Sequence, residues 1–174
     1  MNDFEERLKE GRINSLGKTE EVVSEVLADT DLMEELFNCY FSDDEWVRLR
    51  TSSAVKRVTK AKKELVIPYI DRLLHEISRI DQASTQWTLA QLFALLREDM
   101  TEEQIERATK IMQGNLESHN DWIVLNQTMG TLGEWSQDDM ALAQWLVPHL
   151  ERLREDPRKS VARRASKLLG QLEK

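Results

Sequence analysis

The chain has 174 residues, of which 40 % are hydrophobic and 32 % are charged, with 24 Lys and Arg against 32 Asp and Glu. A chain of this size and apolar content can bury a sizeable core, which excludes intrinsic disorder and indicates one domain or one short repeat array. The single cysteine, Cys39, excludes an internal disulfide and a multi-cysteine zinc site.

Apolar residues recur with helical spacing along the chain, and residues that break helices are scarce. Six Gly and three Pro make up about 5 % of the residues, against about 12 % in an average protein. No stretch alternates with the period of two that a strand requires. We expect a short helix near residues 4–8 and longer ones over 19–28, 32–41, 43–60, 64–80, 83–98, 102–117, 121–135, 137–155 and 157–172.

Three of these helix starts carry a capping box. A short oxygen-bearing side chain accepts a hydrogen bond from free N–H groups of the first turn, and an acid or amide three residues later reaches back. The pairs that fit are Ser42 with Glu45, Thr101 with Gln104 and Ser136 with Asp139.

The second half of each expected helix pair repeats along the chain. Steps back of 37, 37 and 40 residues from Val161 lead to Val124, Trp87 and Val47, and the Leu-Gly pair at 169–170 recurs at 132–133. A period of 37 to 40 residues with two helices per unit is typical of a helical repeat protein.

The segment 146–172 resembles one unit of the HEAT-repeat family, in its internal proline, its Asp-Pro turn and its second-helix residues. The matching residues are Pro148, Asp156, Pro157, Val161, Arg163 or Arg164, Ala165 and Gly170. The resemblance covers residues 31–174 as about four units, and Pro68 repeats the proline inside a first helix. It implies a short right-handed all-α solenoid whose second helices line a concave face, with residues 1–30 as an N-terminal capping helical segment.

Motifs for catalysis and cofactors are incomplete in this sequence. The segment from Gly11 to Thr19 resembles a phosphate-binding loop, but it has five residues between its glycines where that loop needs four. His75, His119 and His149 lie on different expected elements and form no HExxH pair. We therefore expect no enzyme activity, no metal and no cofactor.

Trp46, Trp87 and Trp122 all lie near the starts of second helices. We expect them to wedge between units with their rings buried, and the alternative is a row of aromatic platforms on the concave face. Trp122 with Asn126 is similar to the Trp-x-x-x-Asp motif of the HEAT-like alkylpurine DNA glycosylases, with an amide where those enzymes have a carboxylate. Because an amide carries no charge, that resemblance implies nucleic-acid binding or a degenerate member of the group.

Charge is unevenly distributed along the chain. Residues 43–63 contain seven basic and three acidic residues, and residues 157–174 contain six basic and one acidic. Residues 121–139 contain four acids and no base. The concave face is therefore expected to be basic at its ends and acidic in its middle, a pattern that fits a protein partner better than a continuous polyphosphate.

The sequence predicts a non-catalytic scaffold that binds an unidentified protein on its concave face, with nucleic acid as the alternative partner. We expect a cytoplasmic monomer or weak homodimer without membrane contact, since the acidic start has no apolar signal segment and no apolar run could span a bilayer. The candidate partner-binding residues are Trp122 and Asn126 together with six basic residues that are expected to face solvent, Arg50, Lys56, Lys60, Arg163, Arg164 and Lys167.

Overall fold

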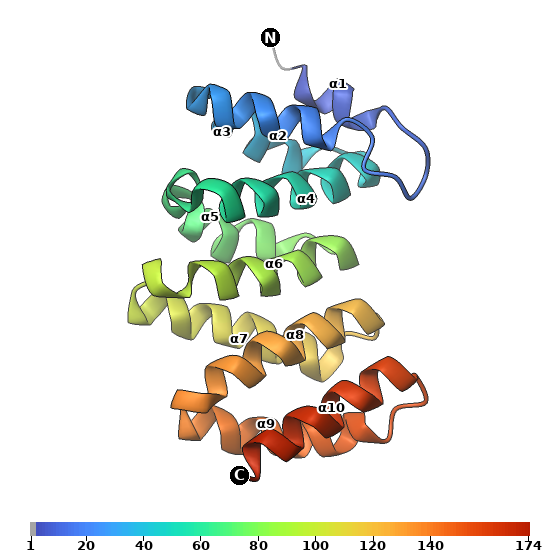
Figure 1. The fold of residues 1–174 in the computed structure, drawn as a ribbon, viewed down its shortest axis with the longest axis vertical. Helices are drawn as coiled ribbons and strands as arrows, with labels where there is room; N and C mark the ends of the chain where they lie inside the picture. Colours follow the sequence, from blue (N-terminus) through green and yellow to red (C-terminus); the bar gives the residue numbers. More distant parts are fainter. Residues whose placement is uncertain (1–2) are drawn as a thin grey trace.

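The computed structural model describes residues 3–174, and within that range it contains helices and loops but no strand (Figure 1). The α-helices are α1 (Phe4–Lys9), α2 (Thr19–Ala28), α3 (Met33–Asn38), α4 (Glu45–Lys62), α5 (Ile70–His75), α6 (Ala83–Leu96), α7 (Glu102–Ser118), α8 (Trp122–Trp135), α9 (Met140–Arg154) and α10 (Lys159–Leu172). Short 3-10 turns lie at Thr30–Leu32, Cys39–Phe41, Lys63–Leu65, Ile67–Tyr69, Ile77–Arg79, Arg97–Asp99 and Ser136–Asp138. The prediction of an all-α protein is confirmed. No helix in this range is both long and apolar enough to cross a membrane.

Alternate helices pack side by side from one end of the molecule to the other. Helix α4 packs on α6, α6 on α8 and α8 on α10, while α2 packs on α4. The intervening helices form contacts behind this row, α5 with α7 and α9 with both α8 and α10. In Figure 1 the helices α4, α6, α8 and α10 lie toward the viewer, and the two chain ends lie at opposite ends of the molecule.

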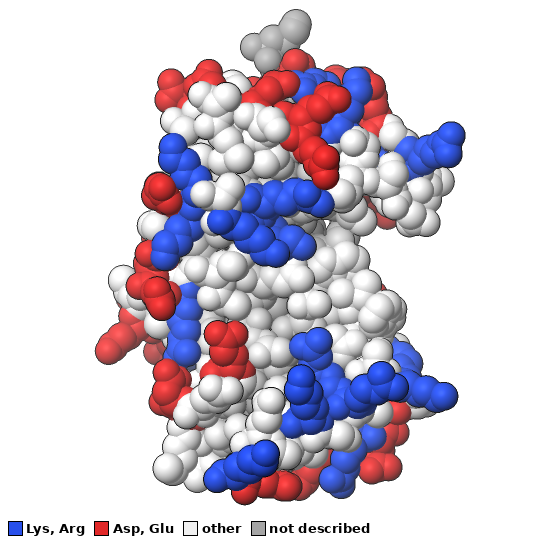
Figure 2. Space-filling view, in the orientation of Figure 1, with Lys and Arg blue, Asp and Glu red and all other residues white. Residues whose placement is uncertain are grey.

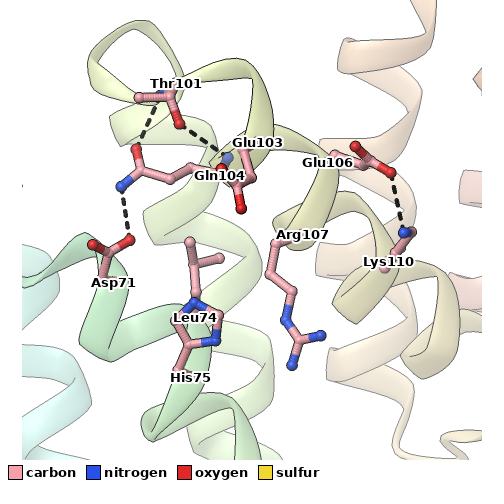
Figure 3. Close-up of a pocket in the computed structure, with 9 residues that line it drawn as sticks. All are labelled: Asp71, Leu74, His75, Thr101, Glu103, Gln104, Glu106, Arg107 and Lys110. Carbon is pink, nitrogen blue, oxygen red and sulfur yellow. Dashed lines mark hydrogen bonds and ion pairs between the residues drawn. The ribbon is translucent and has the colours of Figure 1, made fainter.

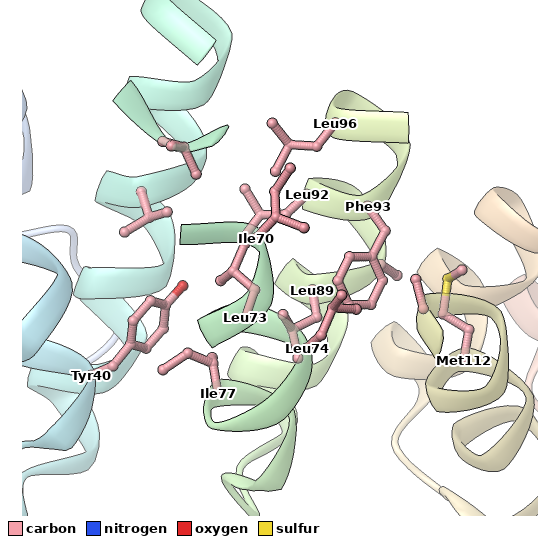
Figure 4. Packing of buried hydrophobic residues seen from close by; sticks show 14 of the residues in the cluster. Tyr40, Ile70, Leu73, Leu74, Ile77, Leu89, Leu92, Phe93, Leu96 and Met112 are labelled. Atoms are coloured by element: carbon pink, nitrogen blue, oxygen red, sulfur yellow. The ribbon is translucent and has the colours of Figure 1, made fainter. Parts of the chain in front are cut away.

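One cluster of buried apolar side chains runs through the whole stack, from Phe4 to Leu169. Figure 4 shows its middle, where Leu73 and Leu74 of α5 lie beside Leu89 and Phe93 of α6. Burying each such side chain stabilises the fold by about 1.5–3 kcal/mol. The N-terminal helices contribute Phe4, Leu8, Val22 and Val26 to the same cluster, so their apolar faces extend the core of the later helices.

Local chemistry at the helix starts agrees in part with the capping boxes. The Thr101 box is present, with the Thr101 hydroxyl accepting from the Gln104 N–H and the Gln104 side chain accepting from the Thr101 N–H. The other two caps were misplaced. Asp44 rather than Ser42 caps α4, and Asp139 rather than Ser136 caps α9, because in each case a carboxylate stands next to the first helical turn.

The expected helix over 64–80 is wrong, because it is broken into three 3-10 turns and the six-residue helix α5. Pro68 lies in the turn Ile67–Tyr69, before α5 and not inside a helix. Proline has no N–H to donate and its ring clashes with the preceding helical turn, so a continuous helix is disfavoured there. Pro148 does lie inside α9, as expected.

Candidate functional site

The exposed side of α4, α6, α8 and α10, here called the groove face, holds two adjoining cavities. The inner cavity, of about 350 Å³, lies over α6 and α8 and is lined from α4 by Lys56 and Lys60. The α8–α10 cavity, of about 570 Å³, is lined by residues of those two helices alone. The two cavities share three lining residues, Gln127, Gly130 and Arg164, so they lie next to each other and are together called the groove.

Two glycines of α8 allow side chains of α10 to approach closely. A Cβ atom at Gly133 would lie 2.7 Å from the Leu168 Cδ2, and a Cβ atom at Gly130 would lie 2.8 Å from the Arg164 Nη1. Leu168 therefore fills the space beside Gly133, and the Arg164 guanidinium lies against the α8 backbone at Gly130. The second contact places a cation directly over the middle of the groove.

Seven of the eight predicted site residues line this groove. The inner cavity contains Lys56, Lys60 and Arg164. The α8–α10 cavity contains Trp122, Asn126, Arg163, Arg164 and Lys167. Helices far apart in sequence thus bring the predicted residues to one face, and their role in binding stays a prediction.

Arg50 is the exception, and the expectation that it faces solvent is wrong. Its side chain is only 1 % exposed. The Arg50 guanidinium donates hydrogen bonds to three backbone carbonyls, those of Leu8 at 2.7 Å, Arg12 at 3.0 Å and Ser15 at 3.1 Å. These carbonyls belong to the end of α1 and the loop that follows it, which folds over the start of α4. Arg50 is therefore a structural residue that holds this loop.

Five basic side chains on the groove face have no ion-pair or hydrogen-bond partner among residues 3–174. Most basic side chains elsewhere in the described chain are paired, as Arg7 is with Glu25 at 2.6 Å and Lys63 with Asp99 at 2.9 Å, although some, such as Arg79 and Arg107, are not. Burial, together with the charges of Lys60 and Arg57, lowers the pKa of the Lys56 ammonium. The five unpaired cations are Lys56, Lys60, Arg163, Arg164 and Lys167.

The expectation that the middle of this face is acidic is wrong, because most of the acidic residues in 121–139 cap helices or form an ion pair outside the groove. Asp121 and Asp139 cap the starts of α8 and α9, and Asp138 pairs with Arg97 at 3.0 Å. Only Glu134 lines the groove. Figure 2 accordingly shows two groups of basic side chains on this face, separated by a largely uncharged, hollowed stretch.

Polar and aromatic groups on α8 complete the groove. The Trp122 side chain is 50 % exposed and lines the α8–α10 cavity, so the expectation of a buried wedge is wrong for this residue. Asn126 is only 6 % exposed, and its Nδ2 donates to the Ser160 Oγ at 3.3 Å. The Asn126 Oδ1 is buried without a hydrogen-bond partner, and so is the Gln91 Oε1 in the inner cavity. Trp46 and Trp87 are partly buried.

Gly130, Gln127, Gln91 and Glu134 line the groove but were not predicted as site residues. A signal for two of them was present in the sequence. Gly130 lies four residues after Asn126, and Glu134 four residues after Gly130, so both share the helix stripe of the predicted residues. Helical spacing alone could have extended the predicted site along α8.

A larger cavity, of about 710 Å³, lies elsewhere, between α5 and α7 (Figure 3). Several of its polar groups bind one another. The Gln104 Nε2 donates to Asp71 at 2.9 Å, and Lys110 pairs with Glu106 at 3.0 Å. This cavity has mixed charges and no uncompensated cluster of one sign, in contrast to the groove face.

The glycine segment 11–19 and the histidines do not form a binding site in the described part of the chain. The segment with Gly11 and Gly17 forms the loop that Arg50 holds. In the part of the chain that the structure describes, no three metal-binding side chains lie close enough to hold an ion. No protein-family model and no curated protein matches this chain.

Proposed function

We propose that the chain is a short HEAT-like α-solenoid, and that it acts as a non-catalytic scaffold binding a protein partner along the groove face. The successive packing of α4, α6, α8 and α10 supports the solenoid, because each second helix of such an array contacts the next one. Under this proposal α3, α5, α7 and α9 are the first helices of four pairs, and residues 1–30 cap the first pair.

The observation that carries this proposal is the set of five unpaired cations on one face. A charge with no partner is most stabilised when a partner of opposite sign arrives, and such patches steer and select binding partners. Most basic residues on the rest of the described surface are paired, so the clustering of five unpaired cations along one groove distinguishes the groove face.

The spacing of the cations favours a protein over a polyphosphate. Neighbouring helices pack about 8–10 Å apart, so α4 and α10 lie roughly 25–30 Å from each other. Between the α4 lysines and the α10 cations, of which Arg164 reaches the same cavity, the groove is lined by Glu134 and by amides and small or apolar groups such as Gln91 and Ala94. A protein segment with acidic groups at two places and neutral residues between them matches this arrangement. A continuous polyphosphate would place negative charge beside the Glu134 carboxylate and over uncharged groups.

The proposal is tested by affinity capture with a charge-reversed groove. The variant Lys60→Glu with Arg163→Glu changes one exposed cation in each group, and Arg107→Glu on α7 is the matched control outside the groove. We expect one protein to be retained by the wild-type chain and by the control, and to be lost by the groove variant. Retention that does not differ among the three chains, or that disappears on nuclease treatment, contradicts the proposal.

Nucleic acid is the second candidate partner, and the half-exposed Trp122 beside three cations favours it. An exposed indole can stack on a base while Arg163 and Lys167 contact phosphates. Titration with duplex and single-stranded DNA at low and moderate salt separates the two candidates. Tight binding that weakens steeply with salt and quenches tryptophan fluorescence would make the groove a nucleic-acid site. The absence of binding at low salt leaves the protein partner.

A further inference from the structure

The α8–α10 cavity differs in charge from every other cavity described above. Its lining includes the cations Arg163, Arg164 and Lys167 and no carboxylate. The three residues lie within two turns of α10, so their charges meet within one site. None of them has an ion-pair or hydrogen-bond partner in the described chain, so the positive charge of the cavity is uncompensated.

Two further features mark this cavity as a built site. Arg164 lies against α8 because position 130 is glycine, as a Cβ atom there would come within 2.8 Å of the Arg164 Nη1. Asn126, which is only 6 % exposed, lines the cavity with a buried Oδ1 that accepts no hydrogen bond. A buried polar atom without a partner is costly in a folded protein, and a bound ligand that donates an N–H removes that cost.

We propose that this cavity binds a phosphate monoester carried by a side chain of the protein partner. The inference rests on the proposed function, and it names the chemical group of the partner that the groove binds. A phosphorylated side chain has a charge of about −1.5 to −2 at neutral pH and three acceptor oxygens, which suits three clustered cations better than one carboxylate does. Arginine clusters are a recurring means of recognising phosphorylated segments.

The neighbouring groups fit the rest of such a segment. When its side-chain amide turns toward the cavity, Asn126 can accept a backbone N–H of the partner next to the phosphorylated residue, which satisfies the oxygen that is buried and unpartnered in the described chain. Trp122 packs its exposed ring against the side chain that carries the phosphate. A nucleic-acid chain offers phosphodiesters with one charge each, so it can match the three cations only with several successive phosphates, whereas one monoester brings a charge of about −1.5 to −2 to a single point.

The test is calorimetric titration of the full chain with O-phosphoserine, with phosphotyrosine, with glutamate, and with a short single-stranded oligonucleotide that has no terminal phosphate. We expect saturable binding of the two phosphate monoesters and none of glutamate. Arg164→Gln should weaken that binding about tenfold or more, because hydrogen bonds from charged groups are lost. Lys159→Gln, on α10 but outside the cavity, should leave it unchanged.

A pair of glycine variants tests whether monoester binding depends on the position of the Arg164 guanidinium as well as on its charge. Gly130→Ala keeps every charge but moves the Arg164 guanidinium, and should weaken monoester binding about threefold or more without lowering the melting temperature. Gly114→Ala on α7 is the matched control, because a Cβ atom at Gly114 has no neighbour within 4 Å. Equal affinity in the two variants would overturn the assigned role of Arg164.

The outcomes also separate this inference from the scaffold proposal. A chain that binds no monoester, while its groove variant still loses a captured protein, overturns the phosphate site alone. Tighter binding of the oligonucleotide than of the monoesters overturns it in favour of nucleic acid. Monoester binding by a chain that fails the capture experiment overturns the protein source of the phosphate.

Discussion

Arg50 in α4 and Arg164 in α10 occupy equivalent positions of the repeat that the sequence predicts, 114 residues apart, but have different environments. Arg50 is 1 % exposed and donates to three backbone carbonyls. Arg164 is exposed on the groove face and has no partner in the described chain. Equivalent positions in a repeat thus share a location on the helix, while the neighbouring segment decides what the side chain does there.

The neighbouring segments explain this contrast. The loop before α2 runs over the start of α4 with three residues at positive φ, Gly11 at 129°, Asn14 at 67° and Gly17 at 53°. Its backbone carbonyls point at Arg50 and need donors. Beside α10 there is no such loop, and Arg164 lies against the bare helix at Gly130. The first arginine stabilises the fold, and the second is available for a partner.

The largest expected effect comes from replacing these two arginines by methionine. Arg50→Met removes three hydrogen bonds from a buried cation and should lower the free energy of unfolding by about 3–5 kcal/mol. Arg164→Met, on the surface, should change it by about 0.5 kcal/mol or less. Urea denaturation followed by circular dichroism measures both. Equal losses would remove the distinction between the two positions.

Two glycine substitutions compare the loop that contacts Arg50 with the helix that contacts Arg164. Gly17 has a positive φ, and a Cβ atom there would collide with the Glu10 carbonyl oxygen, so Gly17→Ala should destabilise by about 2–4 kcal/mol. Gly130 lies inside a helix against the flexible end of Arg164, so Gly130→Ala should be neutral or stabilise by up to about 1 kcal/mol. Thermal melting of both variants checks the opposite signs. A large loss at Gly130 would mean that Arg164 cannot move aside.

The sequence could predict most helices and most groove residues, because both depend on spacing along one helix. Lys56, Lys60 and Arg163 were placed correctly on the outer stripe of their helices. The burial of Arg50 could not be predicted in this way. The carbonyls that its guanidinium binds belong to α1 and the loop after it, about 40 residues earlier, which no helical periodicity describes. The prediction of an acidic middle of the groove face was wrong for a similar reason. A count of charges along the chain does not reveal that Asp121 and Asp139 cap helices.

The N-caps of α4 and α8, unlike Arg50 and Arg164, should contribute similar amounts to the free energy of unfolding. The Asp44 carboxylate accepts from the Trp46 N–H at 2.8 Å and the Val47 N–H at 3.2 Å. The Asp121 carboxylate accepts from the Ile123 N–H at 2.8 Å and the Val124 N–H at 3.0 Å.

Because the cap depends only on its own helix turn, Asp44→Ala and Asp121→Ala should each cost about 1 kcal/mol. Chemical denaturation of the two variants in parallel measures these losses. A difference of more than about 1 kcal/mol would show that tertiary context controls the caps as well.

The smallest effect should come from Lys60, where removing a cation is expected to stabilise the fold. Lys56 and Lys60 are four residues apart on α4, and like charges at that spacing destabilise a helix by about 0.2–0.5 kcal/mol. Lys60→Gln should therefore raise the free energy of unfolding by about that amount at low salt, and less at high salt. Denaturation at two ionic strengths measures the change.

The same variant should change how Lys56 titrates. Burial, Lys60 and Arg57 lower the pKa of Lys56, and Glu134 is the carboxylate that lines its cavity. Since the folded chain then releases this proton at lower pH than the unfolded chain, stability should rise with pH in the window just below 10.5, the usual lysine pKa. Lys60→Gln raises the pKa of Lys56 and should flatten that rise, which NMR titration of the Lys56 side chain can follow. An unchanged pKa would mean that burial and Arg57, and not the charge of Lys60, lower the pKa of Lys56.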